Sequence, residues 1–199
     1  MTFQAPRFDK PPAIAETIAA LPDSATCLGL YFNDVIDTVA RARPDADLFA
    51  LANIKKRRYF PFFSYPYADM LAILATGAKL VHPRVSHGEA IRRLGYRVYE
   101  KLFATKVGQL VFGVLGNDVE HVLLAGPRGY SMSSNFGEVT AEVVGEKKAI
   151  YHFRKYPALL ETYQVGVFEG ALAFMKVTGT VRVSLIDVAN ADIEVTWGT

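Results

Sequence analysis

The histidines and the single cysteine are the residues of this chain best suited to bind a metal. The four histidines are His82, His87, His121 and His152, and none shows the His-x-x-x-His or His-Glu-x-x-His spacing that places two ligands on one helix face. Cys27 has no cysteine or histidine close to it in sequence, so we expect a small, buried apolar side chain there. A lone cysteine also leaves no intrachain disulfide. The sequence therefore predicts no metal site.

Two pairs of carboxylates have the close spacing that acid–base chemistry uses. Asp34 and Asp37 fall in a predicted helix, and Glu138 and Glu142 fall in a predicted strand. Both pairs are most simply solvated faces, because a catalytic carboxyl needs burial or a like charge to shift its pKa. No Gly-x-Ser-x-Gly elbow, phosphate-binding loop or Gly-x-Gly-x-x-Gly fingerprint is present. We therefore expect that the protein is not an enzyme.

The most unusual local feature is a basic run followed by aromatic residues. Residues 55–58 read Lys-Lys-Arg-Arg, and residues 59–67 contain six aromatics and two prolines. Basic and aromatic residues together can bind nucleic acid, but these lie in separate blocks and the net charge is only +2. We expect a solvated turn leading into a segment that covers the core, and no nucleic-acid partner. An alternative is an anionic head group on the basic run, with an apolar tail under Phe62, Phe63 and Tyr67.

Length and composition indicate an ordinary globular chain. The sequence has 199 residues, of which 51% are hydrophobic and 21% charged. A domain of this size can bury about 70% of its unfolded surface. The N-terminus lacks the basic start and apolar core of a signal peptide, and no uncharged stretch approaches the length of a membrane span. We therefore expect a cytoplasmic protein without a membrane span.

Hydrophobic periodicity predicts a first half made of helices. Residues 1–24 form a lead-in with a short helix, and the remaining chain, 25–199, is expected to be one domain. Ser86 and Glu89 have the spacing of a capping box, in which each side chain bonds the backbone amide of the other. Gly95 inside the following helix indicates a close backbone contact. Helices are predicted over residues 13–21, 28–40, 47–54, 66–80, 86–103, 106–116 and 119–124, the last ended by Gly126-Pro127.

After a predicted polar loop at residues 128–137, the period changes to that of strands. Alternating runs at 138–144 and 149–154, and again at 181–185 and 193–197, predict two hairpins. Between them, residues 157–177 are predicted to form a helix, where Gly166 and Gly170 allow a close neighbour. The fold class is therefore α+β: a helical N-terminal half followed by an antiparallel β-β-α-β-β sheet with helices packed on it.

Several segments, taken in their order and spacing, form a pattern shared with known proteins. They are Gly29-Leu30-Tyr31-Phe32, Tyr65-Pro66-Tyr67, Gly88 to Tyr96, Gly108-Gln109, Tyr163 to Leu172 and Ile193 to Trp197. Over about residues 25–198 the chain resembles a family of uncharacterised proteins of about 200 residues, known chiefly from myxobacteria. Its second half also resembles the structural group of vinyl-reductase-type ligand-binding domains, Golgi transport-particle subunits and heme-based nitric-oxide sensors. The resemblance implies an α+β fold, frequent dimers and an apolar pocket between helices and sheet.

Heme is the cofactor that this wider resemblance raises. Its sensors carry a Tyr-x-Ser-x-Arg signature that holds the heme propionates. Here the corresponding stretch begins at Tyr130 but has Met132 in place of the serine and Ser134 in place of the arginine. His87 at a predicted helix start is the one axial ligand to consider, and it reads as a surface residue. We therefore expect no heme and no other cofactor.

The resemblance and the surplus of aromatic residues predict a non-enzymatic module that senses a small apolar ligand or contacts another protein. We expect it to form a homodimer. The alternative is a ligand-free scaffolding subunit that acts as a dimer; a packed interior would favour it, whereas an apolar cavity would favour the sensor. The residues predicted to line the pocket are Phe32, Tyr59, Phe63, Tyr67, Met70 and Phe103.

Overall fold

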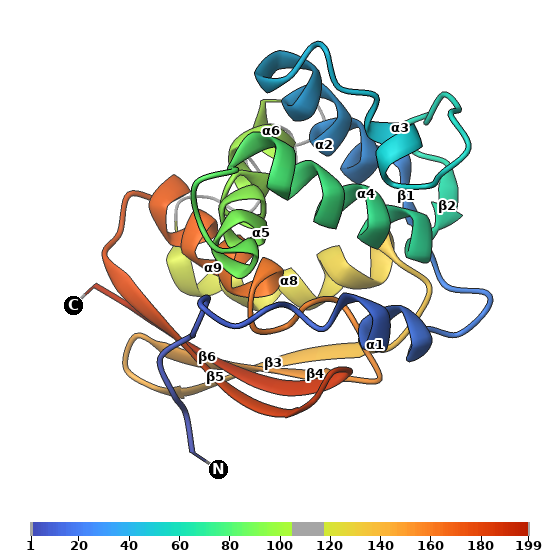
Figure 1. The fold of residues 1–199 in the computed structure, drawn as a ribbon. Helices are drawn as coiled ribbons and strands as arrows, with labels where there is room; N and C mark the ends of the chain where they lie inside the picture. The colour runs from blue at the N-terminus through green and yellow to red at the C-terminus, as the bar shows by residue number, and fades with distance from the viewer. Residues whose placement is uncertain (1, 105–117, 199) are drawn as a thin grey trace.

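The computed structural model describes residues 2–104 and 118–198 as a layer of helices on one antiparallel sheet (Figure 1). The predicted α+β fold, with its helical first half, is confirmed. The elements are α1 (Ile14–Ala19), β1 (Thr26–Leu28), α2 (Gly29–Ala42), α3 (Leu48–Leu51), β2 (Ser64–Pro66), α4 (Tyr67–Val81), α5 (His87–Tyr96), α6 (Val98–Phe103), α8 (Val119–Ser133), β3 (Glu138–Gly145), β4 (Lys148–Arg154), α9 (Tyr163–Phe174), β5 (Gly179–Asp187) and β6 (Asn190–Trp197).

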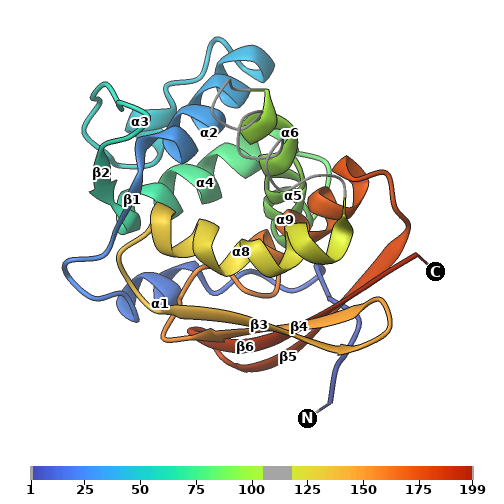
Figure 2. The ribbon, with the colours of Figure 1, turned by 180° about the vertical axis from the view of Figure 1, so that it is seen from behind.

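The main sheet has four strands in the order β3-β4-β6-β5, all antiparallel. Both predicted hairpins are present, and the second strand of each lies in the centre. Along β4, Ala149, Tyr151 and Phe153 are buried and their neighbours are less so, as the alternation predicts. Figure 2 shows α8 lying along the helical face of this sheet, beneath α4. The inward residues of β4 therefore point at the helical layer.

Helices α5 and α9 pack with their backbones in contact. A Cβ added at Gly166 would overlap the carbonyl oxygen of Arg92, and one added at Gly170 would overlap that of Tyr96. Gly95 meets the backbone of α9 from the other side. The predicted close approach at all three glycines is confirmed, and only a residue without a side chain fits each position.

Half of the predicted capping box is formed at the start of α5. The Ser86 hydroxyl accepts from the Glu89 amide at 3.2 Å. The Glu89 carboxylate does not bond back to the Ser86 amide; it accepts instead from Arg92 and Arg93. The reciprocal contact was therefore wrongly predicted, because two guanidinium groups one turn away are stronger donors than a backbone amide. Arg92 also bonds Glu169, which joins α5 to α9 through charge as well as through the glycines.

The predicted stop at Gly126-Pro127 is wrong, since α8 continues through both residues to Ser133. A proline inside a helix lacks the amide that would bond the carbonyl four residues earlier, here that of Leu123. The Tyr151 hydroxyl donates to this carbonyl instead. The Leu123 carbonyl therefore has a hydrogen-bond partner although the helix contains a proline. Residues 128–133, which were predicted to form a loop, are helical.

The prediction of a helix starting at Pro157 is also wrong, because α9 begins at Tyr163. The backbone between them is held in another way: the Tyr156 amide bonds Ala189 O at 2.8 Å, and Leu159 has a positive φ of 54°. Arg97 likewise separates α5 from α6, where one continuous helix over 86–103 was predicted. The helix predicted over 106–116 lies outside the described residues.

The N-terminal segment runs back to the sheet before α1. Gln4 and Val183 exchange both backbone hydrogen bonds, at 3.0 and 2.9 Å, on the outer edge of β5. Asn135 joins the helical half to the start of β3, since its side chain accepts from the Thr26 amide and donates to Ser24 O. None of the helices in the described part of the chain is long and apolar enough to cross a membrane.

Candidate functional site

A cavity of about 180 Å³ lies within the helical layer, above the centre of the sheet. Helices α4, α6, α8 and α9 contribute most of its lining, with additional side chains from β1, α2 and β4. Its principal lining residues are Tyr67 and Met70 of α4, Phe103 of α6, Tyr130 of α8, and Tyr163 and Val167 of α9.

The start of α4 is fixed by the small sheet of β1 and β2. These strands pair with Cys27 opposite Tyr65, and the Tyr67 amide then donates to Ala25 O at 2.9 Å. Tyr67 packs against Phe136 with ring centroids 4.7 Å apart. Met70 follows one turn later and is 2% exposed. Both side chains are thus set against the cavity by the helix start.

Helix α8 carries polar groups to the opposite wall. The Tyr130 hydroxyl donates to Gln164 Oε1 at 2.7 Å, which joins α8 to α9 across the cavity lining. The hydroxyls of Ser133 and Ser134 both donate to the carbonyl oxygen of Tyr130, at 3.0 and 3.1 Å. These side chains reach the cavity only because α8 continues past Pro127.

The cavity is electrically neutral over the residues that the structure describes, since no acidic, basic or histidine side chain lines it. Burial raises the pKa of the Tyr67, Tyr130 and Tyr163 phenols well above the usual value of 10. Burial also raises the pKa of the Cys27 thiol to about 12. At neutral pH the polar lining therefore consists of uncharged hydroxyl, thiol and amide groups.

Among the lining phenols, Tyr67, Tyr99 and Tyr163 form no hydrogen bond in the described part of the chain. Tyr67 is 7% exposed. A buried hydroxyl without a partner costs free energy, so a molecule that offers an acceptor oxygen would gain from meeting one.

The structure brings three of the six predicted pocket residues together. Tyr67, Met70 and Phe103 line the cavity. Phe32 and Tyr59 do not; their rings stack on each other with centroids 4.2 Å apart, in a separate aromatic cluster beside β2. The sixth residue, Phe63, lies on the surface.

Further lining residues were not anticipated from the sequence. They include Tyr31, Tyr99, Tyr130, Tyr163 and Gln164. Tyr163 and Gln164 are the first residues of α9, just before Gly166. Their position beside a closely packed glycine is the sequence feature that could have identified them. Tyr130 was noted only as the first residue of the incomplete heme signature, and its segment was predicted to be a loop.

Of the candidate metal and acid–base residues, Cys27 lines the cavity, whereas the histidines and the paired carboxylates do not. Within the described ranges, no cluster of three histidine, cysteine or carboxylate side chains is arranged to hold a metal. His152 bonds Asp192 at 2.5 Å on the face of the sheet away from the helices, and His87 Nε2 lies 2.9 Å from Ala75 O. Glu138 and Glu142 are exposed, as predicted. Asp34 is not simply solvated, since burial raises its pKa.

This α+β fold is similar to that of solved H-NOX proteins. The H-NOX protein from S. oneidensis in its Fe(II)NO state has a TM-score of 0.70 and 11% identity, covering 86% of this chain and 99% of that chain. The unliganded Fe(II) H-NOX protein from K. algicida has a TM-score of 0.66 and 11% identity, covering 86% and 97%. At this identity the likeness concerns the fold.

The chain belongs to the family described as "Protein of unknown function (DUF2378)", whose profile matches residues 22–198. An oxygen-binding H-NOX domain related to soluble guanylate cyclases is a further structural neighbour, with a TM-score of 0.65, 12% identity and coverage of 86% and 95%. Among curated protein sequences, none matches this chain.

Heme is relevant to this fold, because one of the similar solved structures comes from work on heme distortion in the H-NOX family. No histidine lines it in the described ranges, and residues 105–117 contain no histidine, cysteine, tyrosine or methionine. His87, the axial ligand considered above, bonds the backbone of α4 instead. The lining phenols and the Cys27 thiol are held in their protonated forms, which are poor iron ligands.

The polar side of a heme site is also missing. Met132 is 70% exposed, and Ser134 occupies the position where the sensor signature has an arginine. No arginine or lysine of the described residues lines the cavity to neutralise propionates. The residues present therefore do not fit heme.

Proposed function

We propose that this chain is a small-ligand-sensing domain whose cavity binds a small, uncharged and largely apolar molecule that carries a hydrogen-bond acceptor. The observation that supports this most is the cavity itself: aromatic and aliphatic side chains surround it, and its polar groups are neutral donors such as Tyr67 and Tyr163. Ligand sites of proteins commonly combine an apolar lining with a few placed polar groups. The H-NOX-like fold supports a sensing role by analogy.

The volume of the cavity and its uncharged lining limit the class of ligand. A cavity of about 150 Å³ lined by apolar residues is known to take up benzene, and the cavity here measures about 180 Å³. A single ring with a small substituent matches this volume. A carboxylate or phosphate would enter without a counter-charge, which costs several kcal/mol, so the ligand should be neutral.

The cavity also has a direct connection to the sheet. Tyr151 of β4 lines the cavity and bonds the backbone of α8. A ligand packed against Tyr151 would change the contact between α8 and the sheet, and this is the route by which we propose that occupancy is signalled. No chemical step is part of the proposal.

Three similar probes test the ligand class: acetophenone, which is neutral with an acceptor; ethylbenzene, which lacks the acceptor; and benzoate, which is charged. Ligand-detected NMR and thermal unfolding would measure binding. We expect acetophenone to bind more tightly than ethylbenzene and benzoate not to bind. Tyr67→Phe and Tyr163→Phe should reduce the preference for acetophenone, about fivefold for a lost neutral hydrogen bond.

Tyr59→Phe is the matched control, because it removes the hydroxyl of a buried tyrosine outside the cavity. It should leave the preference unchanged. Preferred binding of benzoate, or equal effects of Tyr59→Phe and Tyr67→Phe, would contradict the proposal.

The homodimer and the cytoplasmic location stay predictions. Sedimentation velocity over a range of concentrations tests the dimer. If the protein is a dimer and binds none of the three probes, the alternative of a ligand-free scaffolding subunit is favoured instead.

A further inference from the structure

Residues 55–63, between α3 and β2, form a surface segment that we call the basic–aromatic loop. It lies at the outer edge of the helical layer, away from the main sheet (Figure 1). Phe60, Phe62 and Phe63 are 46%, 68% and 66% exposed. The ring centroids of Phe60 and Phe63 are 5.6 Å apart, so these two rings form one apolar patch, and the exposed Phe62 precedes Phe63 in the chain. The expectation that several aromatics of residues 59–67 cover the core holds for Tyr59 and Tyr67 but not for these three phenylalanines.

The exposure of the rings is fixed by the backbone. The amides of Gly29 and Leu30, at the start of α2, donate to the carbonyls of Phe63 and Pro61 at 2.8 and 3.0 Å. A Cβ at Gly29 would overlap the carbonyl of Phe60, so the loop lies directly on the helix start. These backbone contacts therefore hold the loop in a conformation in which the rings of Phe60, Phe62 and Phe63 face solvent.

Basic side chains flank the patch. Arg57 is neutralised by Asp69 at 2.8 Å and lies over the Tyr59 ring. In the described part of the chain, no carboxylate lies within ion-pair distance of Lys55, Lys56 or Arg58, and all three are exposed. These cations have no counter-charge of their own, in a protein whose net charge is only +2.

We propose that the basic–aromatic loop docks on an anionic lipid surface, with Phe62 and Phe63 entering the boundary between head groups and acyl chains. Lysine and arginine attract anionic lipids, and apolar rings bury area in that boundary. The two contributions need a cation and exposed rings side by side, and the Arg58 guanidinium lies over the Phe60 ring, 5.0 Å from its centroid. Nucleic acid is less favoured, because Phe60 and Phe63 pack on each other rather than presenting separate faces to bases.

The test is sedimentation of the purified full chain with vesicles of phosphatidylcholine, with and without phosphatidylglycerol. We expect binding only to the anionic vesicles, weakened by added salt. Lys55→Gln combined with Lys56→Gln should lower the partition coefficient by roughly 25-fold, at about fivefold for each basic residue. Phe62→Ser combined with Phe63→Ser should lower it at least tenfold.

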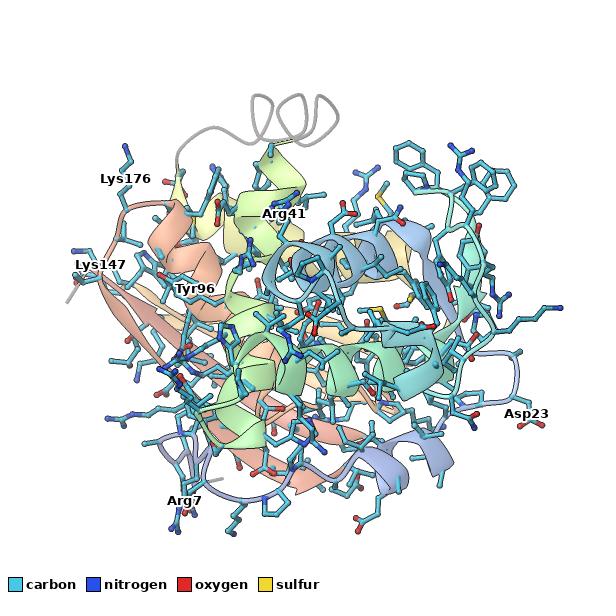
Figure 3. The ribbon with its side chains drawn as sticks, turned by 45° about the horizontal axis from the view of Figure 1, so that its top comes forward. Arg7, Asp23, Arg41, Tyr96, Lys147 and Lys176 are labelled. Atoms are coloured by element: carbon cyan, nitrogen blue, oxygen red, sulfur yellow. The ribbon has the colours of Figure 1, made fainter. Side chains whose placement is uncertain are left out.

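Lys147→Gln with Lys176→Gln is the matched control, since it removes the same charge on the side of the molecule opposite α3 and β2 (Figure 3). Ile186→Ser, at a residue 61% exposed at the end of β5, controls for loss of surface apolar area. Both should bind as the unchanged protein does. Equal losses in the controls would overturn the proposal, as would absence of binding to anionic vesicles.

Two other occupants give distinct results. If the phenylalanine variant changes only the monomer–dimer equilibrium, the patch is an interface between two copies and the lipid proposal is wrong. If the lysine variant loses affinity for a single-stranded oligonucleotide while vesicles never bind, the patch binds nucleic acid and the proposal is again wrong. Should the phenylalanine variant fail to fold, the lysine pair and its control still decide.

Discussion

The hydroxyl of Tyr151 donates a hydrogen bond to the carbonyl oxygen of Leu123, the group that Pro127 leaves without a helical partner. A strand side chain thus completes a helix that a proline interrupts. Gly126 makes room for this contact, because a Cβ there would lie 2.6 Å from the Tyr151 hydroxyl oxygen. Proline, glycine and tyrosine form one structural unit that extends α8 to the cavity wall.

Tyr151→Phe should destabilise the protein by about 1–3 kcal/mol, because it leaves a buried carbonyl unpaired. With Pro127→Ala in the same chain the cost should be smaller, since an amide at position 127 then supplies the missing donor. A double-mutant cycle from urea unfolding measures this coupling. Tyr156→Phe, whose hydroxyl contacts Ser134, should cost the same with either residue at 127. Additive effects of Tyr151→Phe and Pro127→Ala would contradict the assignment.

Gly166→Ala and Gly170→Ala should each destabilise by more than about 2 kcal/mol, because the new methyl group overlaps the backbone of α5. Gly129→Ala in α8 is the matched control: nothing lies within 4 Å of the added Cβ, and helix propensity then favours alanine by about 1 kcal/mol. Thermal unfolding of the three variants measures the expected loss of stability at Gly166 and Gly170 and the expected gain at Gly129. A stabilising effect at Gly166 would show that α5 and α9 are farther apart than described.

Hydrogen bonds from Arg92 hold the pKa of Glu89 at about 2, below its usual 4.5, with Arg93 assisting. A lowered folded-state pKa gives stability that is present above the unfolded value and lost as pH falls through the folded one. Glu89→Gln should therefore cost about 1 kcal/mol at neutral pH, and the difference should shrink between pH 4.5 and about 2. Unfolding free energies against pH measure it. Glu146→Gln, in the exposed β3–β4 turn, is the control, and a difference that grows in acid would contradict the prediction.

Cys27 should be unreactive in the folded protein, because burial raises its pKa to about 12 and only 3% of the residue is exposed. Iodoacetamide at neutral pH should label it only after unfolding in urea. A Cys27→Ser chain with Ser131→Cys, an exposed position on α8, should be labelled readily when folded. Rapid native labelling of Cys27 would show that the cavity wall opens at β1.

The helices that depend on local residues could be predicted from the sequence, whereas the limits of α8 and α9, which depend on distant residues, could not. The helix predicted over residues 28–40, observed as α2, and the cap at Ser86 depend on residues within one or two turns of each other. The length of α8 is not, since the donor that rescues its proline comes from a residue 28 positions beyond Leu123. The start of α9 was missed for a similar reason, because contacts to Ala189 hold the segment before it.

Aromatic and apolar character in the sequence identified residues of the core. It did not distinguish residues that fill the core from residues that line the cavity. Phe32 and Tyr59 were reasonable pocket residues, and both are buried, yet they fill space by stacking on each other. Phe63 was expected inside because exposed rings are unfavourable, and its backbone anchors to α2 were not visible in the sequence. Whether an aromatic ring lines a void depends on what stands opposite it, which is a property of the tertiary structure.

The bonds between Gln4 and Val183 have one more consequence, for association between copies. An outermost strand offers unpaired amides and carbonyls to any extended chain that can add to it. The leading segment occupies this position at the middle of β5, so the free stretches on either side are short. A protein truncated before Pro11 would expose the whole outer edge of β5. We expect it to self-associate through this edge.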